Sequence, residues 1–471
     1  MTVLVAGGGI TGLVAARELA NLGIPAAVLE TAPRFGGKIA TERVDGYVVE
    51  RGPDSFVTFR PAAVELVREL GLADELVSTR EPRTVHVSHR GRLHPMPDGF
   101  GLVLPTRLRP FVTTGLFSVP EKLRMSLDLA LPRMADGEGD EPVGRFLRRR
   151  VGDAAVDRLA GPLIGGVYGT PIDELSMDAV VPQLRAAEQD HRSLLLAGLA
   201  EGRAARRVNA QATGSPAPLG LFVSLAGGMG CLVDALVAEL AAAPGVELRP
   251  GTAVRELAPR GTGLIARLSD GTEMPAEAAI LATPGTVTGA LLEPISAAAA
   301  AAVRSIRQGS TAVVSLGYPV HRVAQLPDGH GVLVPRSEGM TIGACTWSSR
   351  KWPGRAPAGR LLVRAFMPDS PPGSDEAIAA IARAEVGRLL AIDGQPELVR
   401  VARWQAAMPR YTVGHLGRVA AAEEALRPWP AITLAGASFH GVGLPDCIAQ
   451  GRAAAHRVAA VIGATRIRVA V

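Results

Sequence analysis

The first forty residues contain the feature that most limits how this chain can fold. An apolar stretch, TVLVA, runs into the loop GGGITG, which is followed by the helical pattern LVAARELANLG and a second apolar stretch, PAAVLE. A glycine loop between a buried strand and a helix, with a second strand after the helix, is typical of a βαβ unit. The sequence therefore predicts a parallel sheet that starts at the N-terminus.

The loop holds Gly7, Gly9 and Gly12 in the spacing G-x-G-x-x-G, and Glu30 ends the second predicted strand, 18 residues after Gly12. The glycines allow a tight turn and let a pyrophosphate approach the helix N-terminus, while a carboxylate at this position can accept hydrogen bonds from ribose hydroxyls. The alternative is a glycine turn in a purely structural unit, with Glu30 solvated. We predict a dinucleotide site.

A second glycine pair follows directly, in the string Arg34-Phe35-Gly36-Gly37-Lys38. A nicotinamide site has no need of it, whereas the longer phosphate and ribityl span of FAD does, although Arg and Lys here could also be surface charges. The chain has no second G-x-G-x-x-G with strand and helix on either side, so we expect no NAD(P)H site and a flavin reoxidised by oxygen or another acceptor. The predicted contacts of a noncovalent FAD are Arg34, Gly36, Gly37 and Lys38.

A second loop-to-helix junction, GVGLPDCIAQG, occupies 441–451. Free backbone N–H groups and the positive dipole end of such a helix would stabilise the charge that reduction places on the pyrimidine edge of a flavin. Val442, Gly443 and Leu444 are therefore predicted cofactor contacts. Asp446 is an N-cap candidate, with a catalytic role as the alternative, and Cys447 is a small buried residue or a redox or covalent flavin site.

Composition excludes several classes of function. With 471 residues, 47% hydrophobic and 20% charged, the chain has the balance of a soluble globular protein of two or three domains. Its net charge of +5 does not indicate nucleic-acid binding, because only Lys38, Lys122 and Lys351 of the 50 basic residues are lysine, a bias typical of codon composition. The basic block RFLRRR at 145–150 is predicted to be a solvated helix face, with a phosphate or lipid site as the alternative.

Cysteine usage and hydropathy indicate the compartment. Cys231, Cys345 and Cys447 have neither close pairing nor metal-ligand spacing, so we expect a cytoplasmic protein without a metal or disulfides. The apolar start lacks a basic n-region and is interpreted as a strand, and no run reaches the 18 or so apolar residues of a membrane span. Peripheral contact with the inner face of the membrane and a homodimer stay open.

The pattern along the chain predicts a mixed α/β fold in which one nucleotide-binding domain is assembled from distant segments. A hairpin is expected at 84–96 with its turn at Arg90-Gly91, and residues 202–218 are expected to form a polar surface connection. The expected domains are a Rossmann-like FAD-binding domain (1–75 with 220–295 and 425–471), an antiparallel-sheet substrate domain (76–96 with 296–424) and a mainly helical insertion (97–219).

Several blocks carry a resemblance to a known family. They are VAGGGITGLVAARELA, PRFGGK, GPDSF at 52–56, IGGVYGTPIDELSM at 164–177, FVSLAGGMGCLVDAL, RWQAAMPRYTVGH at 403–415 and LAGASFHGVGLPDCIAQG. Together they resemble the protoporphyrinogen/coproporphyrinogen III oxidase family of FAD enzymes, within the amine-oxidase-like flavoproteins. The resemblance covers nearly the whole chain and is closer to the bacterial coproporphyrinogen III oxidase branch.

The resemblance implies a place in haem biosynthesis, with coproporphyrinogen III oxidised to coproporphyrin III and protoporphyrinogen IX as a second substrate. Six electrons would leave in three cycles, each as a hydride to flavin N5, and three O₂ would become H₂O₂. No strong side-chain base is required, and none stands out in the sequence. Gly165 or Gly166 could offer backbone contacts to the macrocycle, and a helix-ending turn is the alternative reading of both.

The resemblance also suggests individual site residues. Arg83, in EPRTVHV, matches the arginine that contacts a substrate carboxylate. Trp404 matches an aromatic residue near the flavin, although core packing explains it nearly as well, and Val254 is included among the cofactor contacts. Three strand residues are candidates for the ring face, with an ordinary core as the alternative: Leu333, Val334 and Met340.

Two rival functions stay open. A flavin amine oxidase or carotenoid desaturase of the same superfamily is the nearest, but amine oxidases commonly flank the flavin with aromatic residues near the C-terminal block. None of the four tyrosines lies in 431–450, which disfavours that function. The other rival is a non-catalytic flavoprotein that serves as a partner or carrier of porphyrin.

Overall fold

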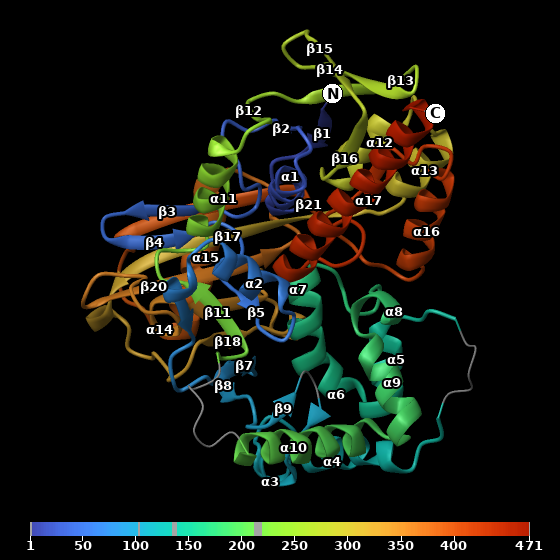
Figure 1. Cartoon of the computed structure of the whole chain (residues 1–471). Coiled ribbons are helices and arrows are strands. Elements are labelled where there is room, and N and C mark those ends of the chain that lie inside the picture. The colour runs from blue at the N-terminus through green and yellow to red at the C-terminus, as the bar shows by residue number, and fades with distance from the viewer. Residues whose placement is uncertain (1, 102–103, 134–138, 212–218, 471) are drawn as a thin grey trace.

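The computed structural model describes residues 2–101, 104–133, 139–211 and 219–470 (Figure 1). It contains a parallel sheet beneath the N- and C-terminal helices, a larger, mainly antiparallel sheet, and a helical region at the lower end of the view in Figure 1. Within the described part of the chain, no helix combines the length and apolar character that a bilayer crossing requires.

The parallel sheet carries the N-terminal glycine loop. Its strand order is β12-β2-β1-β16-β22, so the beginning, middle and end of the chain lie side by side, with Val3 opposite both Ala26 and Ala278. All of β1 is buried, as expected for a parallel strand covered on both faces. The strands are β1 (Val3–Ala6), β2 (Ala26–Glu30), β12 (Val246–Pro250), β16 (Ala278–Leu281) and β22 (Ile432–Leu434).

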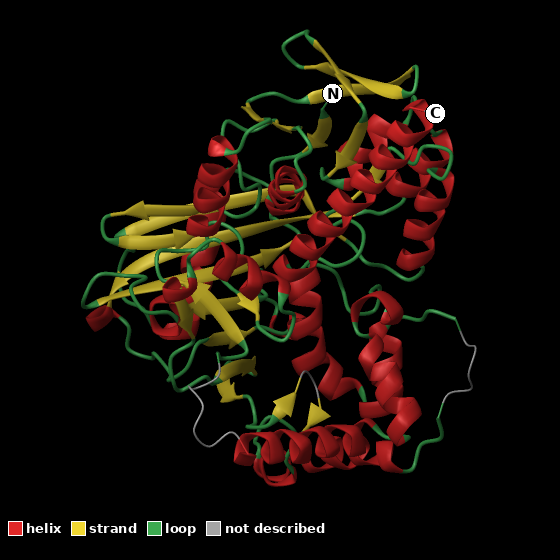
Figure 2. Cartoon of the chain, in the orientation of Figure 1, coloured by secondary structure: helices red, strands yellow, loops and turns green. Residues whose placement is uncertain are grey.

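Helices cover both faces of this sheet (Figure 2). One face packs on α1 (Ile10–Asn21), α2 (Ala62–Glu69), α11 (Gly230–Ala242) and α17 (Leu444–Ala470). The opposite face packs on α12 (Gly285–Leu292), α13 (Ala297–Arg304), α16 (His415–Ala425) and the small antiparallel sheet of β13 (Val254–Arg260), β14 (Gly263–Leu268) and β15 (Glu273–Ala276).

The larger sheet has seven strands in the order β21-β17-β20-β19-β18-β7-β8, and α15 (Asp375–Leu390) covers one of its faces. The other face turns toward the helical region through Val87 and Leu333. The strands are β7 (Val85–His89), β8 (Arg92–Pro95), β17 (Gln308–Pro319), β18 (Gly331–Leu333), β19 (Ala344–Trp347), β20 (Arg360–Pro368) and β21 (Leu398–Pro409); α14 (Ser348–Lys351) follows β19.

Short strands join the two large sheets. The hairpin of β3 (Thr41–Val44) and β4 (Tyr47–Glu50) follows the glycine loops, and β5 (Phe56–Val57), β11 (Phe222–Leu225) and β6 (Leu76–Ser78) form a three-stranded sheet in the order β5-β11-β6. β9 (Phe100–Gly101) and β10 (Leu104–Pro105) pair at the entry to the helical region. These links bring segment 50–56 next to segment 222–230, close to the N-terminal loops.

The helical region has its own apolar core and contains one π-helix, Val156–Gly165, with Pro162 inside it. Wide helical turns of this kind are often found at functional sites. The helices are α3 (Leu108–Thr113), α4 (Val119–Ser126), α5 (Val143–Val151), α6 (Asp153–Ala155), α7 (Gly166–Tyr168), α8 (Met177–Val180), α9 (Pro182–His191) and α10 (Leu194–Gln211).

Two sequence-based predictions in this region are wrong. Residues 202–211, expected to be a surface connection, complete helix α10, because alanine and arginine are good helix formers; residues 212–218 lie outside the described part of the chain. The block 145–150 is not a fully solvated face. Arg150 is buried and pairs with the buried carboxylates of Asp128 and Glu188, which stabilise a charge that could not be buried alone.

The hairpin predicted at 84–96 is confirmed by the pairing of β7 with β8.

Candidate active site

The N-terminal glycine loop turns β1 into α1 and leaves room at the helix N-terminus. Gly7 has a φ of +104°, which favours glycine. A Cβ on Gly12 would lie 1.9 Å from the Gly7 carbonyl oxygen, so the third glycine permits close contact between helix and strand. A Cβ on Gly9 would meet no atom within 4 Å. The space in front of Gly9 therefore fits a pyrophosphate held by backbone N–H groups.

Glu30 ends β2 beside this loop. Its carboxylate accepts hydrogen bonds from the backbone N–H groups of Gly8 (2.8 Å) and Ala32 (2.8 Å). A carboxylate has about four lone-pair sites, so this arrangement still permits a bond from a ribose hydroxyl. At the same end of the sheet, Thr252 N–H donates to the Glu30 carbonyl oxygen (2.8 Å), and Val254 is buried two residues further on. Contacts of Glu30 and Val254 with the cofactor stay predictions.

The second glycine pair packs against the first loop. Gly36 N–H donates to the Gly8 carbonyl oxygen (2.8 Å), and a Cβ on Gly37 would lie 3.2 Å from the Gly9 Cα. Arg34 does not reach outward, because its guanidinium donates to three carbonyl oxygens of its own turn, including that of Gly37 (2.7 Å). The string that pointed to FAD therefore forms one continuous wall with the fingerprint loop.

Lys38 and Trp404 both lie against Gly52. A Cβ on Gly52 would lie 1.9 Å from the Lys38 carbonyl oxygen and 3.7 Å from the Trp404 ring, whose Nε1 donates to the Arg51 carbonyl oxygen (2.9 Å). Burial lowers the pKa of the Lys38 ammonium, which lies close enough to Cys447 in α17 for the two groups to interact electrostatically. Lys38 therefore extends the wall of the site toward the C-terminal helix.

The C-terminal junction presents a second helix N-terminus. Gly441 has a φ of +125°, Gly443 follows in the same turn, and α17 begins at Leu444. The N-cap role predicted for Asp446 is wrong, because this residue lies within the first turn of the helix. Its carboxylate folds back over the glycines and pairs with Arg60. A negative charge in the first turn is favourable to the helix dipole, which accounts for the residue without a catalytic role.

Helices α1 and α17 cross in close contact, with α1 seen nearly end-on in Figure 1 and α17 running past it. A Cβ on Gly451 would lie 2.5 Å from the Thr11 carbonyl oxygen and 3.2 Å from the Val14 side chain. Only a glycine permits this approach. The N-terminus of α1, predicted to bind the pyrophosphate, and the N-terminus of α17, predicted to bind the flavin ring, are therefore held near one another by packing.

The end of the π-helix offers an open, apolar surface. Gly165 is buried, and a Cβ there would lie 2.9 Å from the Thr170 carbonyl oxygen. Gly166 is exposed, a Cβ on it would meet no atom within 4 Å, and the next side chain, Val167, is 62% exposed. Val442, from the turn before α17, packs against the same helical core. A flat apolar molecule could therefore approach the backbone at Gly166 beside the turn that leads into α17.

The three strand residues predicted for the ring face are divided between the two faces of the large sheet. Leu333 packs with the helical region. Val334 and Met340 pack with the core beneath α15, so assigning them to the same face as Leu333 is wrong. The reason is the side-chain alternation of an extended chain, which sends Leu333 and Val334 to opposite sides.

Arg83 lies between β6 and β7. Its half-exposed side chain pairs with Glu81, with 2.9 Å between Nε and Oε1. The guanidinium lies 3.6 Å from the Cβ position at Gly220, whose carbonyl oxygen accepts a hydrogen bond from the Thr58 hydroxyl (3.0 Å). Thr58 is two residues from Arg60, which pairs with the first turn of α17. The predicted carboxylate ligand is thus connected to that turn by a short series of contacts.

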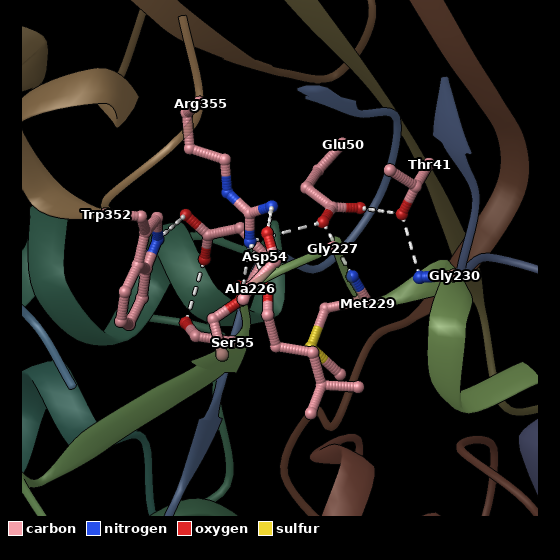
Figure 3. A network of polar contacts seen from close by, with 12 residues as sticks. Thr41, Glu50, Asp54, Ser55, Ala226, Gly227, Met229, Gly230, Trp352 and Arg355 are labelled. Atoms are coloured by element: carbon pink, nitrogen blue, oxygen red, sulfur yellow. Dashed lines mark hydrogen bonds and ion pairs between the residues drawn. The ribbon is translucent and has the colours of Figure 1, made fainter. Parts of the chain in front are cut away.

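A buried polar network behind the second glycine pair was not predicted from the sequence (Figure 3). Glu50, at the end of β4, accepts hydrogen bonds from the Thr41 hydroxyl (2.7 Å) and the Met229 N–H (2.7 Å). Arg355 lies 3.7 Å from Glu50 and donates to the Ser224 hydroxyl oxygen (2.8 Å). The network joins the parallel sheet region to the large sheet, and the block GPDSF at 52–56 was its signal.

Asp54 is the second carboxylate of this network. It accepts hydrogen bonds from Trp352 Nε1 (3.1 Å) and the Ser55 hydroxyl (2.8 Å). Burial alone would raise the pKa of Asp54, but the cations of Lys351 and Arg364 lower it well below its usual range. Arg364 also donates to the carbonyl oxygen of Gly52 (2.5 Å), the residue whose Cβ position lies against the Lys38 carbonyl oxygen. The network therefore supports the wall of the site from behind.

The matching family model, described as flavin containing amine oxidoreductase, covers residues 10–459. The chain belongs to the flavin containing amine oxidoreductase family. Family membership makes the cofactor a flavin, and the dinucleotide-type loop with its second glycine pair makes it FAD. The residues described above fit this cofactor, because the space at Gly9 and the two helix N-termini have the donors that a pyrophosphate and an electron-rich ring edge require.

Within this family, curated relatives named coproporphyrinogen III oxidase match the chain over nearly its whole length. The relative from Propionibacterium freudenreichii is 44% identical, over 97% of this chain and 90% of its own, and that from Bacillus subtilis is 37% identical, over 96% of each. The bovine protoporphyrinogen oxidase is 33% identical over 97% of this chain and 98% of its own. These matches confirm the resemblance to the porphyrinogen oxidases.

Solved structures confirm the predicted fold class. A crystal structure from Exiguobacterium sp., whose protein carries a provisional protoporphyrinogen oxidase name, has a TM-score of 0.83 and 31% identity, and covers 97% of this chain and 98% of its own. A putrescine oxidase has a TM-score of 0.69 with 17% identity over 98% of this chain and all of its own, which shows the shared fold alone.

Proposed function

We propose that the chain is an FAD-dependent oxidase that converts coproporphyrinogen III to coproporphyrin III. The reaction removes six electrons and six protons from the substrate and reduces three O₂ to three H₂O₂. The observation that carries the proposal is the 44% identity, over almost the full length of both chains, with a relative named coproporphyrinogen III oxidase. Protoporphyrinogen IX is proposed as a second, slower substrate, since a protoporphyrinogen oxidase is also among the relatives.

In the proposed arrangement, Gly9 and Gly37 would hold the pyrophosphate of FAD, and Lys38 and the turn at Val442–Leu444 would hold the flavin ring. The bound FAD would supply the two-electron oxidation, three times for each porphyrin formed. The free N–H groups at the start of α17 would bind the pyrimidine edge and favour negative charge there. The packing of α1 on α17 fixes these groups in advance of the reaction.

The substrate is proposed to lie over Gly166 and Val167, where an exposed apolar side chain and an open backbone position adjoin the turn. No side-chain base is assigned. Burial raises the pKa of the nearby Tyr168 hydroxyl, so this group stays protonated at neutral pH and cannot accept the pyrrole proton. We propose that the proton leaves to solvent or to a backbone carbonyl oxygen and that Arg83 binds a propionate.

The test is aerobic oxidation of both porphyrinogens by the purified yellow protein, followed by porphyrin fluorescence with a parallel peroxide assay. The expected result is faster formation of coproporphyrin than of protoporphyrin, with three H₂O₂ for each porphyrin. Porphyrin formation at only the spontaneous rate would reject the proposal. Porphyrin formation without peroxide would reject oxygen as the acceptor.

We also propose that the helical region contacts the membrane surface peripherally. Helices α3 and α4 lie at the lower edge of Figure 1. They and the turn after them carry exposed apolar side chains, and a groove between α3 and α10 is lined by three arginines. Apolar side chains beside cations suit an anionic lipid surface. The apolar residues are Leu108, Val112, Val119, Leu123, Leu127 and Leu129; the arginines are Arg107, Arg109 and Arg203.

Cosedimentation with phosphatidylglycerol vesicles tests this contact, with phosphatidylcholine vesicles for comparison. Leu123→Glu should reduce binding, and Leu416→Glu, at an exposed leucine on α16, should leave it unchanged. Equal sedimentation of both variants with the native protein would reject the proposed face. Sedimentation velocity decides the alternative, since a dimer that Leu123→Glu dissociates would make this face a contact between two copies.

A further inference from the structure

Tyr411 is a fully buried tyrosine whose hydroxyl makes two hydrogen bonds to one loop. The hydroxyl donates to the Ala437 carbonyl oxygen (2.8 Å) and accepts from the Gly441 N–H (2.7 Å). Burial raises the pKa of this hydroxyl, so it stays protonated and can act as donor and acceptor at once. Ala437 and Gly441 stand near the two ends of the loop between β22 and α17, and Tyr411 connects them.

The loop depends on such a contact because its backbone is constrained. Gly441 has a φ of +125°, and a Cβ there would lie 2.7 Å from the Asp446 side chain. The residues that follow, Val442 and Gly443, lead into the first turn of α17. The direction in which this helix N-terminus points is therefore set at Gly441, whose N–H is bonded to the Tyr411 hydroxyl.

The ring of Tyr411 is also fixed. It stacks on His415, with 3.7 Å between ring centroids and 17° between planes, and lies 5.6 Å from the Tyr168 ring. His415 Nε2 contacts the carbonyl oxygen of Phe439 in the same loop (2.8 Å). Tyr168 follows Gly166 and Val167 at the open end of the π-helix. One stack thus connects the proposed substrate surface with the loop.

The backbone of Tyr411 is tied to the helical region. Ser176 N–H donates to the Tyr411 carbonyl oxygen (2.8 Å), and Leu175 pairs with Thr412 in an antiparallel bridge. Nearby, Glu174 pairs with Arg307 (3.0 Å). These contacts give a structural place to the block PIDELSM, for which the sequence offered no role. They hold Tyr411 where the helical region, the end of the large sheet and the C-terminal loop meet.

We propose that Tyr411 is a positioning residue of the flavin site: it acts through Gly441 to hold the N-terminus of α17 in the orientation that faces the pyrimidine edge of the flavin. This inference rests on the proposed placement of the flavin ring at Val442–Leu444, but not on the identity of the substrate. Tyr411 does not touch the cofactor in this arrangement. It sets the geometry of the groups that do, as preorganised donors require.

The test compares Tyr411→Phe with native protein in the absence of porphyrinogen. The phenylalanine keeps the stack and removes both hydrogen bonds, so folding is retained while the turn loses its anchor. We expect FAD to bind about tenfold more weakly and the midpoint potential of the bound FAD to become more negative, by about 30 mV for each tenfold loss in preference for the reduced cofactor. Tyr318→Phe is the matched control, because the Tyr318 hydroxyl is buried without a hydrogen-bond partner in the described structure.

The outcomes separate this inference from the proposals on which it depends. A Tyr411→Phe protein with native midpoint potential and native FAD affinity would overturn the positioning role. Lower thermal stability with an unchanged potential would also overturn it, since it would show a merely structural tyrosine. A native protein that binds no flavin would instead reject the proposed flavin site, and flavin binding without porphyrinogen turnover would reject the proposed reaction alone.

Discussion

The sharpest test of the cofactor site is a substitution that changes the cofactor's space and leaves the protein's own packing intact. Gly9 is such a position, because a Cβ there meets no protein atom within 4 Å and its backbone, with φ −72° and ψ 178°, is an extended conformation open to any residue. We therefore expect Gly9→Val to fold but to exclude the pyrophosphate from the N-terminus of α1.

The magnitude follows from two separate terms. Gly9 makes no side-chain cap hydrogen bond, so its replacement removes none. The substitution still costs about 1 kcal/mol of apoprotein stability, because valine is a poorer N-cap residue than glycine. FAD present at 1,000 times its dissociation constant should stabilise the native protein by about 4 kcal/mol, and this gain should vanish in the variant. The loss of ligand-linked stability thus exceeds the direct cost of the substitution severalfold.

The assay is thermal unfolding of the reconstituted apoprotein with and without FAD, together with the flavin absorbance retained after gel filtration. Gly12→Ala provides the contrast, because its Cβ would lie 1.9 Å from the Gly7 carbonyl oxygen and the apoprotein itself should be destabilised. A yellow Gly9→Val protein with a native FAD-induced shift would refute the assigned loop. A fully stable Gly12→Ala apoprotein would refute the packing argument.

Four further outcomes are expected. Gly166→Val should keep its flavin yet lose porphyrinogen turnover, because its Cβ points into open space on the substrate side; normal turnover would remove Gly166 from the site. Arg83→Ala should raise KM more than it lowers kcat, and an unchanged KM would exclude it as a propionate ligand. Asp54→Asn should cost about 3–5 kcal/mol in denaturant unfolding, because it leaves the buried Arg364 without its carboxylate; a loss under 1 kcal/mol would contradict this. Burial lowers the pKa of His415 to about 4, so between about pH 6.5 and 4 the unfolded chain binds a proton at this residue while the folded protein does not. Stability therefore falls as pH falls through this range, at about 1.4 kcal/mol per unit of pKa difference; His415→Gln should flatten this part of the stability profile, and an unchanged profile would argue against a buried neutral imidazole.

The elements that sequence reasoning found are those whose signals are local. The first strand, the glycine loop and α1 carry their pattern within twenty residues, so the βαβ unit followed directly. The same holds for the turn at Gly441–Gly443, because glycines before an apolar helix have few structural meanings. For both loops the sequence also indicated the ligand chemistry, since anions bind where helix N–H groups are free.

The features that sequence reasoning missed depend on distant partners. Glu50 and Asp54 look like surface carboxylates until the fold brings Arg355 and Arg364 from about three hundred residues away. Arg150 was expected in solvent for the same reason, since a basic block in the sequence does not indicate that buried acidic residues from other segments will pair with it. Periodicity predicts which face of a helix or strand is buried. It does not predict which charged residues lie on the element that packs against that face.

The distances within the candidate site are set by contacts between the protein's own segments. The Gly451 contact fixes the crossing of α1 and α17, and therefore the separation of the two helix N-termini. The Tyr411 hydroxyl fixes the turn before α17, and the Gly36 bond to Gly8 fixes the second glycine pair against the first. The Gly451 contact joins the two ends of the chain, so the two helix N-termini come together only when the N- and C-terminal segments have packed against each other. A site built in this way loses little further conformational entropy on binding, which favours tight retention of FAD and places the groups that respond to reduction before the substrate arrives.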